Sequence, residues 1–314
     1  MESNVEMCHH LRAGAARGLG QPQRSTAAAT RPSVASDGWL RALLALCLLP
    51  AVAACSQEPV AMCPAGAGDV TPRGGVERLT VQVIEALPHD ADAFTQGLLL
   101  HDGYLYESTG LYGESTVRRV EPDTGTVIES VDLPSEQFGE GLALAGDRLY
   151  QITWQEQTVH TYDVDGLRPL GDHTYDGEGW GLCYDGERLV MSDGSSTLWF
   201  RDPDTFNAIG QVQVTMDSSP VARLNELECV GDAVYANVWM TDQILKIDPS
   251  TGDVRAVVDA SGLLPRGALL NRDPRDAVLN GIAYDSDRQV FYVGGKWWPT
   301  LFEACFVPES DAGL

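Results

Sequence analysis

The amino-acid sequence predicts an all-β protein folded as a five-bladed β-propeller, and three observations support this prediction. First, a short frame recurs five times: a polar or aromatic residue, then glycine (glutamate in one copy), then an aliphatic residue. The frames begin at Gln96, Glu140, Trp180, Asn225 and Asn280, so successive copies are 44, 40, 45 and 55 residues apart. Second, a tight polar turn follows each frame. Third, no helical periodicity interrupts the short strand-like segments. A repeat of roughly 40–50 residues with several short strands is typical of a propeller.

Each unit repeats the same order of strands and turns. The frame opens a strand such as 141–144, a polar turn such as Ala145-Gly146-Asp147 follows, and a second strand such as 149–153 returns. Glycine or aspartate between two apolar runs predicts a β-hairpin. The third strand ends in a turn such as Asp248-Pro249-Ser250-Thr251-Gly252, and the fourth leads to the next unit. The irregular stretch Ser261–Ala277 accounts for the longest spacing, and we expect it to be a surface loop.

The first and last strands of the repeat region are expected to belong to the same blade. Leu79–Leu87 alternates like a strand although no frame precedes it, and only one further strand, Thr300–Val307, follows the fifth frame. We therefore expect the N-terminal strand to close the last blade, which removes the open edges of the sheet. The predicted propeller domain spans residues 79–314.

Residues 1–55 have the features of an export leader. The apolar run Leu40–Ala54 is too short to span a membrane comfortably, and small residues end it, as in a secretory signal. Val52-Ala53-Ala54-Cys55 resembles the lipobox of bacterial lipoproteins, so Cys55 is predicted to carry lipid; ordinary secretion is the alternative. The preceding segment is long for a signal, which suggests a mis-assigned start. Residues 56–78, rich in proline, glycine and alanine, are predicted to be a flexible tether.

The charge of the chain narrows the classes of partner. Without residues 1–55, which hold five of the 21 basic and three of the 45 acidic residues, the net charge is −26. Such a surface argues against nucleic acid and anionic lipid as partners, so contact with a membrane is expected only through lipid on Cys55. The surface would attract cationic groups, including free α-amines, although solubility is the simpler explanation. We expect an exported monomer, either a cell-envelope lipoprotein or a secreted protein.

Four cysteines lie beyond the lipobox-like sequence: Cys63, Cys183, Cys229 and Cys305. Their spacing is unlike that of a zinc site, and no Cys-x-x-Cys pair occurs. Cys183 and Cys229 occupy nearly equivalent positions in consecutive units, so they are expected either to be neighbours in adjacent blades or to be buried free thiols.

The frame predicts two rings of side chains at one mouth of the central channel. The first strand of each propeller blade lines the channel, and the second strand returns to the same end fourteen residues later, or sixteen in the last unit. The inner ring is Gln96, Glu140, Trp180, Asn225 and Asn280, and the companion ring is Gly110, Trp154, Gly194, Trp239 and Lys296. The mouth therefore holds one carboxylate, three amides, three indoles and one ammonium group. Indoles that cannot be fully buried there suggest a flat site for a small ligand. Burial among them should raise the pKa of Glu140, whereas Lys296 should lower it.

Many of these residues lie in ordered motifs that resemble the plant and bacterial glutamine cyclotransferases. The motifs are Phe94-Thr95-Gln96-Gly97-Leu98, Phe138-Gly139-Glu140-Gly141, Thr153-Trp154, Gly179-Trp180-Gly181-Leu182, Leu224-Asn225-Glu226-Leu227-Glu228, Ala236-Asn237-Val238-Trp239, Leu279-Asn280-Gly281-Ile282 and Gly295-Lys296-Trp297-Trp298-Pro299. The resemblance covers about residues 80–307 and implies a five-bladed propeller that converts N-terminal glutamine of peptides or proteins to pyroglutamate with release of ammonia. It implies that Glu140 is the catalytic acid and base. It also implies a substrate pocket of Gln96, Trp154, Trp180, Asn225, Trp239 and Lys296. Asn280 is a further candidate from its place in the ring.

The expected chemistry needs neither a metal nor another cofactor. The substrate's own α-amine attacks its γ-carboxamide, so no protein nucleophile is required, and no serine or cysteine lies beside a histidine in either ring. A free α-amine has a pKa of about 7.7–8.0, so a modest base suffices. Glu140 would move the proton, the indoles would hold the folded side chain, and Lys296, Asn225 or Gln96 would stabilise the oxyanion.

Two other functions fit parts of the sequence. A calcium-dependent lactonase-like propeller could use Glu140, Asn225 and Asn280, but Ca²⁺ usually takes more carboxylate oxygen, and Lys296 would repel it. A non-enzymatic propeller could bind a peptide or glycan on the indoles, but it would not need a buried carboxylate. Zinc-dependent cyclisation is disfavoured because the histidines are scattered and none lies in a ring. They are His9, His10, His89, His101, His160 and His173.

Overall fold

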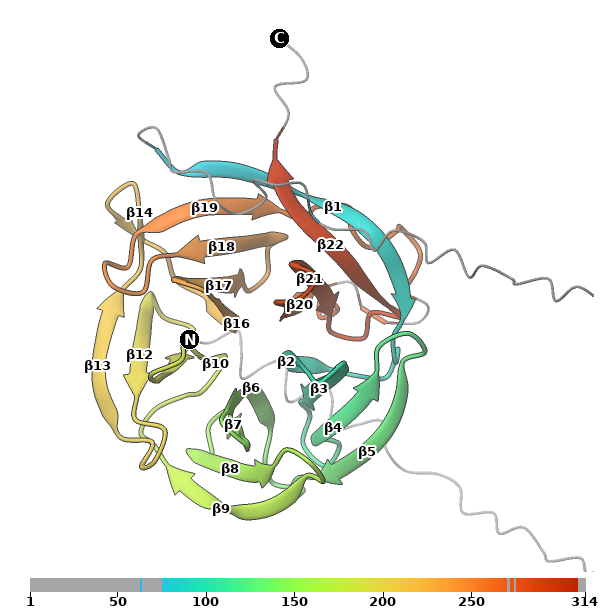
Figure 1. Cartoon of the computed structure of the whole chain (residues 1–314), viewed down its shortest axis with the longest axis vertical. Helices are drawn as coiled ribbons and strands as arrows, with labels where there is room; N and C mark the ends of the chain where they lie inside the picture. Colours follow the sequence, from blue (N-terminus) through green and yellow to red (C-terminus); the bar gives the residue numbers. More distant parts are fainter. Residues whose placement is uncertain (1–62, 64–74, 270–271, 274, 310–314) are drawn as a thin grey trace, which may run out of the picture. The chain divides into compact units, whose positions relative to one another are not determined.

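The computed structural model describes Cys63 and residues 75–269, 272–273 and 275–309, all within one compact unit of residues 57–314 (Figure 1). The predicted leader with its lipobox-like Cys55, and all of the predicted tether except Cys63 and residues 75–78, lie outside the described residues. The proposed domain boundaries therefore stay predictions. Every regular element in the described part is a strand, and no helix there is long and apolar enough to cross a membrane.

Three sheets of four antiparallel strands follow one another along the chain. The first contains β2 (Thr95–His101), β3 (Tyr104–Thr109), β4 (Thr116–Glu121) and β5 (Thr126–Asp132). The second contains β6 (Gly139–Ala145), β7 (Arg148–Thr153), β8 (Thr158–Asp163) and β9 (Arg168–Thr174). The third contains β10 (Leu182–Tyr184), β11 (Leu189–Ser192), β12 (Thr197–Arg201) and β13 (Ala208–Gln213). The chain thus builds each sheet from consecutive hairpins, as the turn residues predict.

The remaining strands form one sheet of eight. Its order begins with β16 (Leu224–Val230), β17 (Ala233–Val238), β18 (Gln243–Ile247) and β19 (Val254–Asp259). It continues with β1 (Glu77–Pro88), β22 (Thr300–Pro308), β21 (Val290–Gly295) and β20 (Leu279–Asp285). β1 pairs antiparallel with β22 and parallel with β19. The predicted closure by the N-terminal strand is therefore confirmed.

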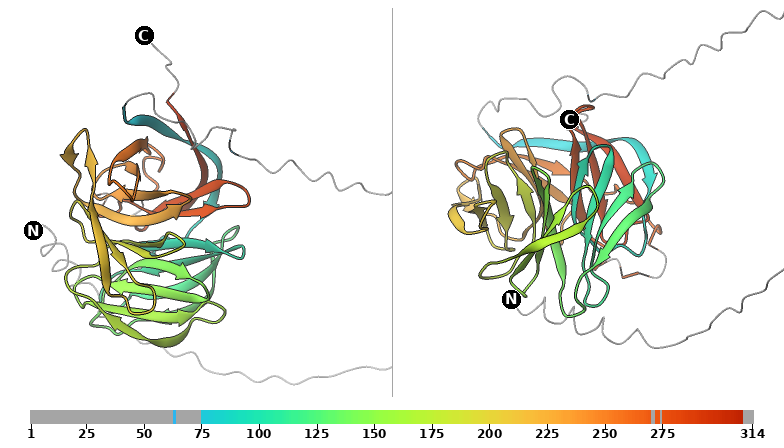
Figure 2. Two further views of the ribbon diagram at one scale, coloured as in Figure 1. Left: turned by 60° about the vertical axis from the view of Figure 1, so that its left-hand side comes forward. Right: turned by 60° about the horizontal axis from the view of Figure 1, so that its bottom comes forward.

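The sheets surround a central axis as the blades of a propeller do, which confirms the predicted fold class. β2, β6, β10, β16 and β20 lie nearest the axis, and β5, β9, β13, β19 and β1 lie at the outside (Figure 1). The count of five blades stays a prediction, because continuous pairing merges the last eight strands into one sheet. A short hairpin that the sequence did not predict, β14 (Thr215–Met216) with β15 (Ser219–Pro220), projects from the rim (Figure 2).

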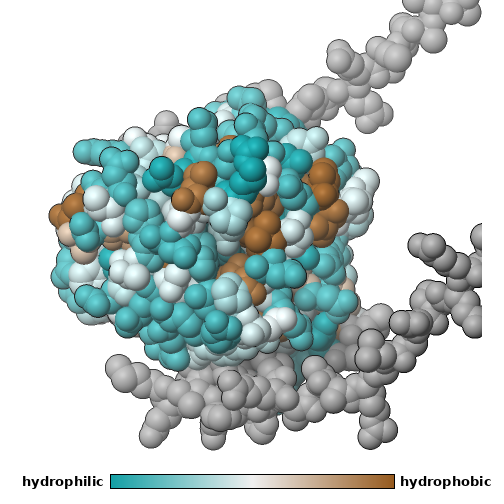
Figure 3. All heavy atoms as spheres, turned by 90° about the horizontal axis from the view of Figure 1, so that it is seen from below, coloured by the Kyte–Doolittle hydropathy of each residue, from teal (hydrophilic) through white to brown (hydrophobic). Residues whose placement is uncertain are grey.

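Apolar side chains are packed between the sheets rather than gathered on the surface. The face shown in Figure 3 is mostly hydrophilic, with a few separate hydrophobic patches. Among the described residues, the exposed large hydrophobic ones are Val83, Val127, Ile128, Leu170, Ile209 and Met240, and five of these six belong to β1, β5, β9 and β13 at the outside of the sheets. Single exposed residues of this kind are normal in soluble domains.

The glycine of the frame allows the innermost strands to approach one another closely. A Cβ atom on Gly97 would lie 2.5 Å from Leu142 N in the next sheet. A Cβ atom on Gly141 would lie 2.4 Å from Leu182 N, and one on Gly181 would lie 2.1 Å from Asn225 O. Only glycine fits such an approach of backbone to backbone. The exception, Glu226, uses its buried carboxylate to accept hydrogen bonds from the N–H groups of Leu98 (3.2 Å) and Ile282 (2.9 Å).

Two disulfides cross-link the described unit. Cys183 and Cys229 form a bond between the innermost strands β10 and β16, so the prediction of neighbours is confirmed and the alternative of free thiols is wrong. Cys63 pairs with Cys305 in β22, across 242 residues of sequence, a pairing that the sequence did not predict. Disulfides persist in oxidising compartments, so the protein is of an exported type.

Replacing both Cys183 and Cys229 by alanine should lower the free energy of unfolding by about 2–4 kcal/mol, because the bond restricts the unfolded chain. Equilibrium denaturation with guanidinium chloride under non-reducing conditions measures this change. Unaltered stability in the double variant would contradict a constraining role for the bond.

Candidate active site

The repeated frame gives the site its geometry through a recurring distortion of the innermost strands. In four hairpins the register between the two innermost strands shifts at the frame residue: Gln96 in β2, Glu140 in β6, Asn225 in β16 and Asn280 in β20. Such β-bulges redirect side chains and are common beside active sites. The predicted inner ring therefore arises from one local feature used repeatedly.

The companion ring is fixed by an equally regular hydrogen bond. The N–H groups of Gly110, Trp154, Trp239 and Lys296 each donate to the carbonyl two residues before a frame residue, at 2.8–3.0 Å. These acceptors are Phe94, Phe138, Arg223 and Val278. The bond ties the end of the second strand to the start of the first, so the two rings lie at the same end of the sheets, as predicted.

Glu140 is buried and belongs to a chain of amide contacts. Gln96 Nε2 donates to Glu140 Oε1 at 3.0 Å. Asn280 Nδ2 donates to Gln96 Oε1 at 3.3 Å and to Thr95 O at 3.0 Å, which fixes which end of the Gln96 amide faces the carboxylate. The structure therefore brings Gln96, Glu140 and Asn280 together.

Burial dominates the protonation of both charged ring residues. It raises the pKa of Glu140 well above its ordinary value, although the nearby Lys296 acts to lower it. Burial also lowers the pKa of Lys296 to about 8, against the attraction of Glu140 and Asp276. Within the described residues no salt bridge holds Lys296, and its Nζ lies 4.7 Å from the centre of the Phe94 ring. The site thus contains an acid and a base whose pKa values lie much closer together than in water.

The prediction of a single carboxylate at this mouth is wrong. Glu156 and Glu178 lie near enough to Glu140 to contribute to the rise of its pKa. Glu178 Oε2 accepts hydrogen bonds from Trp154 Nε1 at 3.0 Å and from Trp180 Nε1 at 3.1 Å. Glu178 stands two residues before a frame residue and Glu156 two residues after a companion residue, so a scan of the neighbours of both rings could have found them.

The indoles are more deeply buried than the sequence indicated. Trp154 and Trp180 are only 7% and 9% exposed, so each keeps only a small part of its surface accessible. They are buried because Glu178 satisfies both of their N–H groups, the usual requirement for a buried tryptophan. Trp239 is half-buried, and its ring meets Trp180 edge to face with centroids 5.6 Å apart. Asn225 is also buried, and its Oδ1 accepts no hydrogen bond from the described residues.

A buried ionic network that the sequence did not predict contacts residues adjacent to the ring residues in the chain. Glu107 accepts hydrogen bonds from Thr95 Oγ1 (2.6 Å), Arg118 Nε (2.9 Å) and His89 Nε2 (3.1 Å). His89 Nδ1 lies 2.6 Å from the carbonyl oxygen of Trp298. Both partners of the imidazole are acceptors, so both ring nitrogens must donate and His89 is protonated. Although burial acts to lower its pKa, Glu107 raises it. The network thus links Thr95, which precedes Gln96, with Trp298, which lies two residues after Lys296.

No group of three or more histidine, cysteine, aspartate or glutamate side chains in the described part of the chain is arranged to hold a metal ion. The oxygen donors expected for Ca²⁺ are also partly committed elsewhere, since Glu140 accepts from Gln96. A buried lysine with a pKa of about 8 would be cationic at neutral pH and would repel a second cation.

Comparisons with known proteins agree with this geometry. A family model described as glutamine cyclotransferase matches residues 51–306. Glutaminyl-peptide cyclotransferase of Arabidopsis thaliana is 44% identical over 227 residues, which are 71% of this chain and 70% of that protein. The crystal structure of Myxococcus xanthus glutaminyl cyclase is 40% identical with a TM-score of 0.70, over 75% of this chain and all of that chain.

Proposed function

The chain belongs to the glutamine cyclotransferase family and is an enzyme of the glutaminyl-peptide cyclotransferase type; we propose that Glu140 is its proton shuttle in a metal-independent reaction. Its substrates are peptides with N-terminal glutamine. The observation that carries the proposal is the buried Glu140, with a raised pKa, beside a buried lysine and buried indoles. A carboxylate that titrates nearer neutral pH can both accept and return a proton.

The reaction requires one proton to move between two nitrogens of the substrate. The neutral α-amine attacks the γ-carbonyl carbon, a C–N bond forms, and the carbonyl oxygen becomes an oxyanion. Glu140 takes a proton from the attacking nitrogen and delivers it to the amide nitrogen. The bond from that nitrogen to the carbonyl carbon then breaks, ammonia leaves, and the pyroglutamyl ring remains. Atoms and charges balance without a protein nucleophile.

The surrounding residues would hold the flexible glutamine side chain in the cyclic conformation. Trp154 and Trp180, fixed by Glu178, and the half-buried Trp239 offer flat walls that restrict it, and proximity of this kind can supply several kcal/mol of the barrier reduction. Asn225, which is buried, stays a predicted member of the substrate pocket. Lys296, cationic at neutral pH, would stabilise the oxyanion.

Ammonia release from a glutaminyl dipeptide by the purified protein tests the proposal. We expect release to continue unchanged in excess EDTA, because the residues of the ring already supply the acid–base and electrostatic groups. Loss of release in EDTA would show that a metal ion takes part in the reaction. No release at all would favour a binding propeller.

The attachment and assembly of the protein are also proposals. We propose that the lipobox-like sequence directs lipidation of Cys55 and that the propeller acts as a monomer on the cell envelope. The two disulfides support an exported location. Mass spectrometry of the mature N-terminus and partition into detergent test the anchor.

A further inference from the structure

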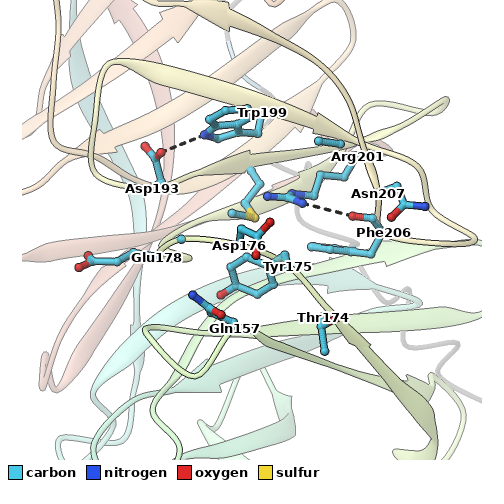
Figure 4. Close-up of a pocket in the computed structure, with 13 residues that line it drawn as sticks. Gln157, Thr174, Tyr175, Asp176, Glu178, Asp193, Trp199, Arg201, Phe206 and Asn207 are labelled. Carbon is cyan, nitrogen blue, oxygen red and sulfur yellow. Dashed lines mark hydrogen bonds between the residues drawn. The ribbon is translucent and has the colours of Figure 1, made fainter.

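A cavity lies between the second and third sheets (Figure 4). It has a volume of about 600 Å³ and is built by the end of β9, the segment leading to β10, and strands β11 and β12. Its lining includes Tyr175, Asp176, Glu178, Asp193, Trp199 and Arg201. A volume of this size exceeds what a single small side chain fills and lies in the usual range of ligand sites.

Glu178 connects this cavity with the candidate active site. The residue lines the cavity, and its carboxylate holds the indole N–H groups of Trp154 and Trp180. Gln157, three residues after Trp154, lines the cavity as well. The cavity and the indoles therefore share Glu178 as a common neighbour.

The cavity contains a buried donor without an acceptor. Arg201 is only 6% exposed, and its guanidinium lies 5.3 Å from the Tyr175 ring centre and 5.2 Å from that of Phe206. One terminal nitrogen donates to Phe206 O at 3.3 Å, as Figure 4 shows, but Nε has no acceptor among the described residues.

The other charged groups of the lining are carboxylates. Asp176 is exposed, Asp193 Oδ2 accepts from Trp199 Nε1 at 2.9 Å, and Glu178 accepts from the indoles. Three carboxylates against one arginine leave the lining negative, and the aromatic rings offer apolar surface between them. A long cationic side chain suits both features, because its methylenes pack on rings while its head remains near carboxylates.

We propose that this cavity binds the peptide segment that follows the N-terminal glutamine and prefers a basic side chain there. A lysine or arginine side chain of the segment is attracted by Asp176 and Asp193, which line the cavity. The inference rests on the proposed cyclotransferase function and adds a substrate preference to it. An acidic side chain is disfavoured because the single cation is buried and the carboxylates are more accessible.

The test uses two series of amidated peptides, Gln-Xaa-Ala and Gln-Ala-Xaa, in which Xaa is lysine, alanine or glutamate. The C-terminal amide removes a carboxylate that would otherwise compete. In one of the two series, we expect kcat/KM for ammonia release to be about two- to fivefold higher with lysine than with alanine, which is the effect of a partly exposed ion pair. In the same series, kcat/KM with glutamate should be lower than kcat/KM with alanine. Raising the salt concentration should reduce the preference.

Asp176→Asn should bring the lysine-to-alanine ratio of kcat/KM close to one. Asp123→Asn, which removes the same charge from an exposed turn of the first sheet, should leave the ratio as in the wild type. Equal rates for all side chains in both series, a preference for glutamate, or an unaltered ratio in Asp176→Asn would each overturn the inference while the proposed function stands. Absence of ammonia release from every peptide would overturn both.

Discussion

Glu140→Gln is expected to lower kcat by roughly 10²–10⁴-fold, the usual contribution of a positioned acid–base group. The amide has the size of the carboxylate but cannot accept a proton from the attacking amine and return it to the leaving nitrogen. Gln96 Nε2 can still donate to the remaining carbonyl oxygen of the substituted residue, so the fold should be preserved. Ammonia release under saturating glutaminyl peptide measures the effect.

The control for this variant is Glu136→Gln, which removes a charge four residues away at an exposed position. It should retain wild-type turnover, and both variants should show wild-type circular dichroism and thermal unfolding. Turnover of Glu140→Gln close to that of the wild type would remove Glu140 from the mechanism.

Lys296→Met should lower kcat/KM by about 10²–10³-fold at neutral pH, the typical loss when an oxyanion-stabilising group is removed. The substitution keeps the length and packing of the buried methylenes near Phe94 while it deletes the charge. The ammonium group is fully present below its pKa of about 8 and is lost as the pH rises through that value. The wild-type rate should therefore fall on the alkaline side of about pH 8, and the variant should lack this fall.

The acidic side of the pH profile gives a second readout of the same variant. Because Lys296 acts to lower the pKa of Glu140, its removal should raise that pKa further and shift the acidic limb of kcat/KM to higher pH. Lys246→Met, at the only other lysine of the chain, is the matched control and should leave both limbs in place. An unaltered rate and profile in Lys296→Met would show that another group stabilises the oxyanion.

Local patterns in the sequence predicted the positions of the strands and of both rings. A frame residue followed by glycine, a polar turn and a returning strand is a unit of about fifteen residues, and the structure repeats the same bulge and the same hydrogen bond in several of these units. The closure of the sheet by Leu79–Leu87 was also predictable, because one strand preceded the first frame and only one further strand followed the last unit's hairpin. Short-range hydrogen bonding and turn chemistry determine the hairpins and the bulges, whereas the closure follows from the number of strands at the two ends of the repeat.

Several features that were missed depend on residues far apart in the chain. The disulfide between Cys63 and Cys305, the contact of His89 with the carbonyl oxygen of Trp298, and the cavity around Arg201 arise only when distant segments lie side by side. Spacing along a sequence does not encode which side chains face one another across two sheets.

The sequence by itself determined the propeller class, the two rings and the identity of Glu140 and Lys296 as the charged members of those rings. Only the tertiary structure decided how those two groups ionise and how many other carboxylates surround them. Ring closure buries both groups and places Glu178 against two indoles that are 24 and 2 residues away in the sequence. The physical reason is that ionisation depends on desolvation and on charges within a few ångströms, and both are properties of the assembled sheets.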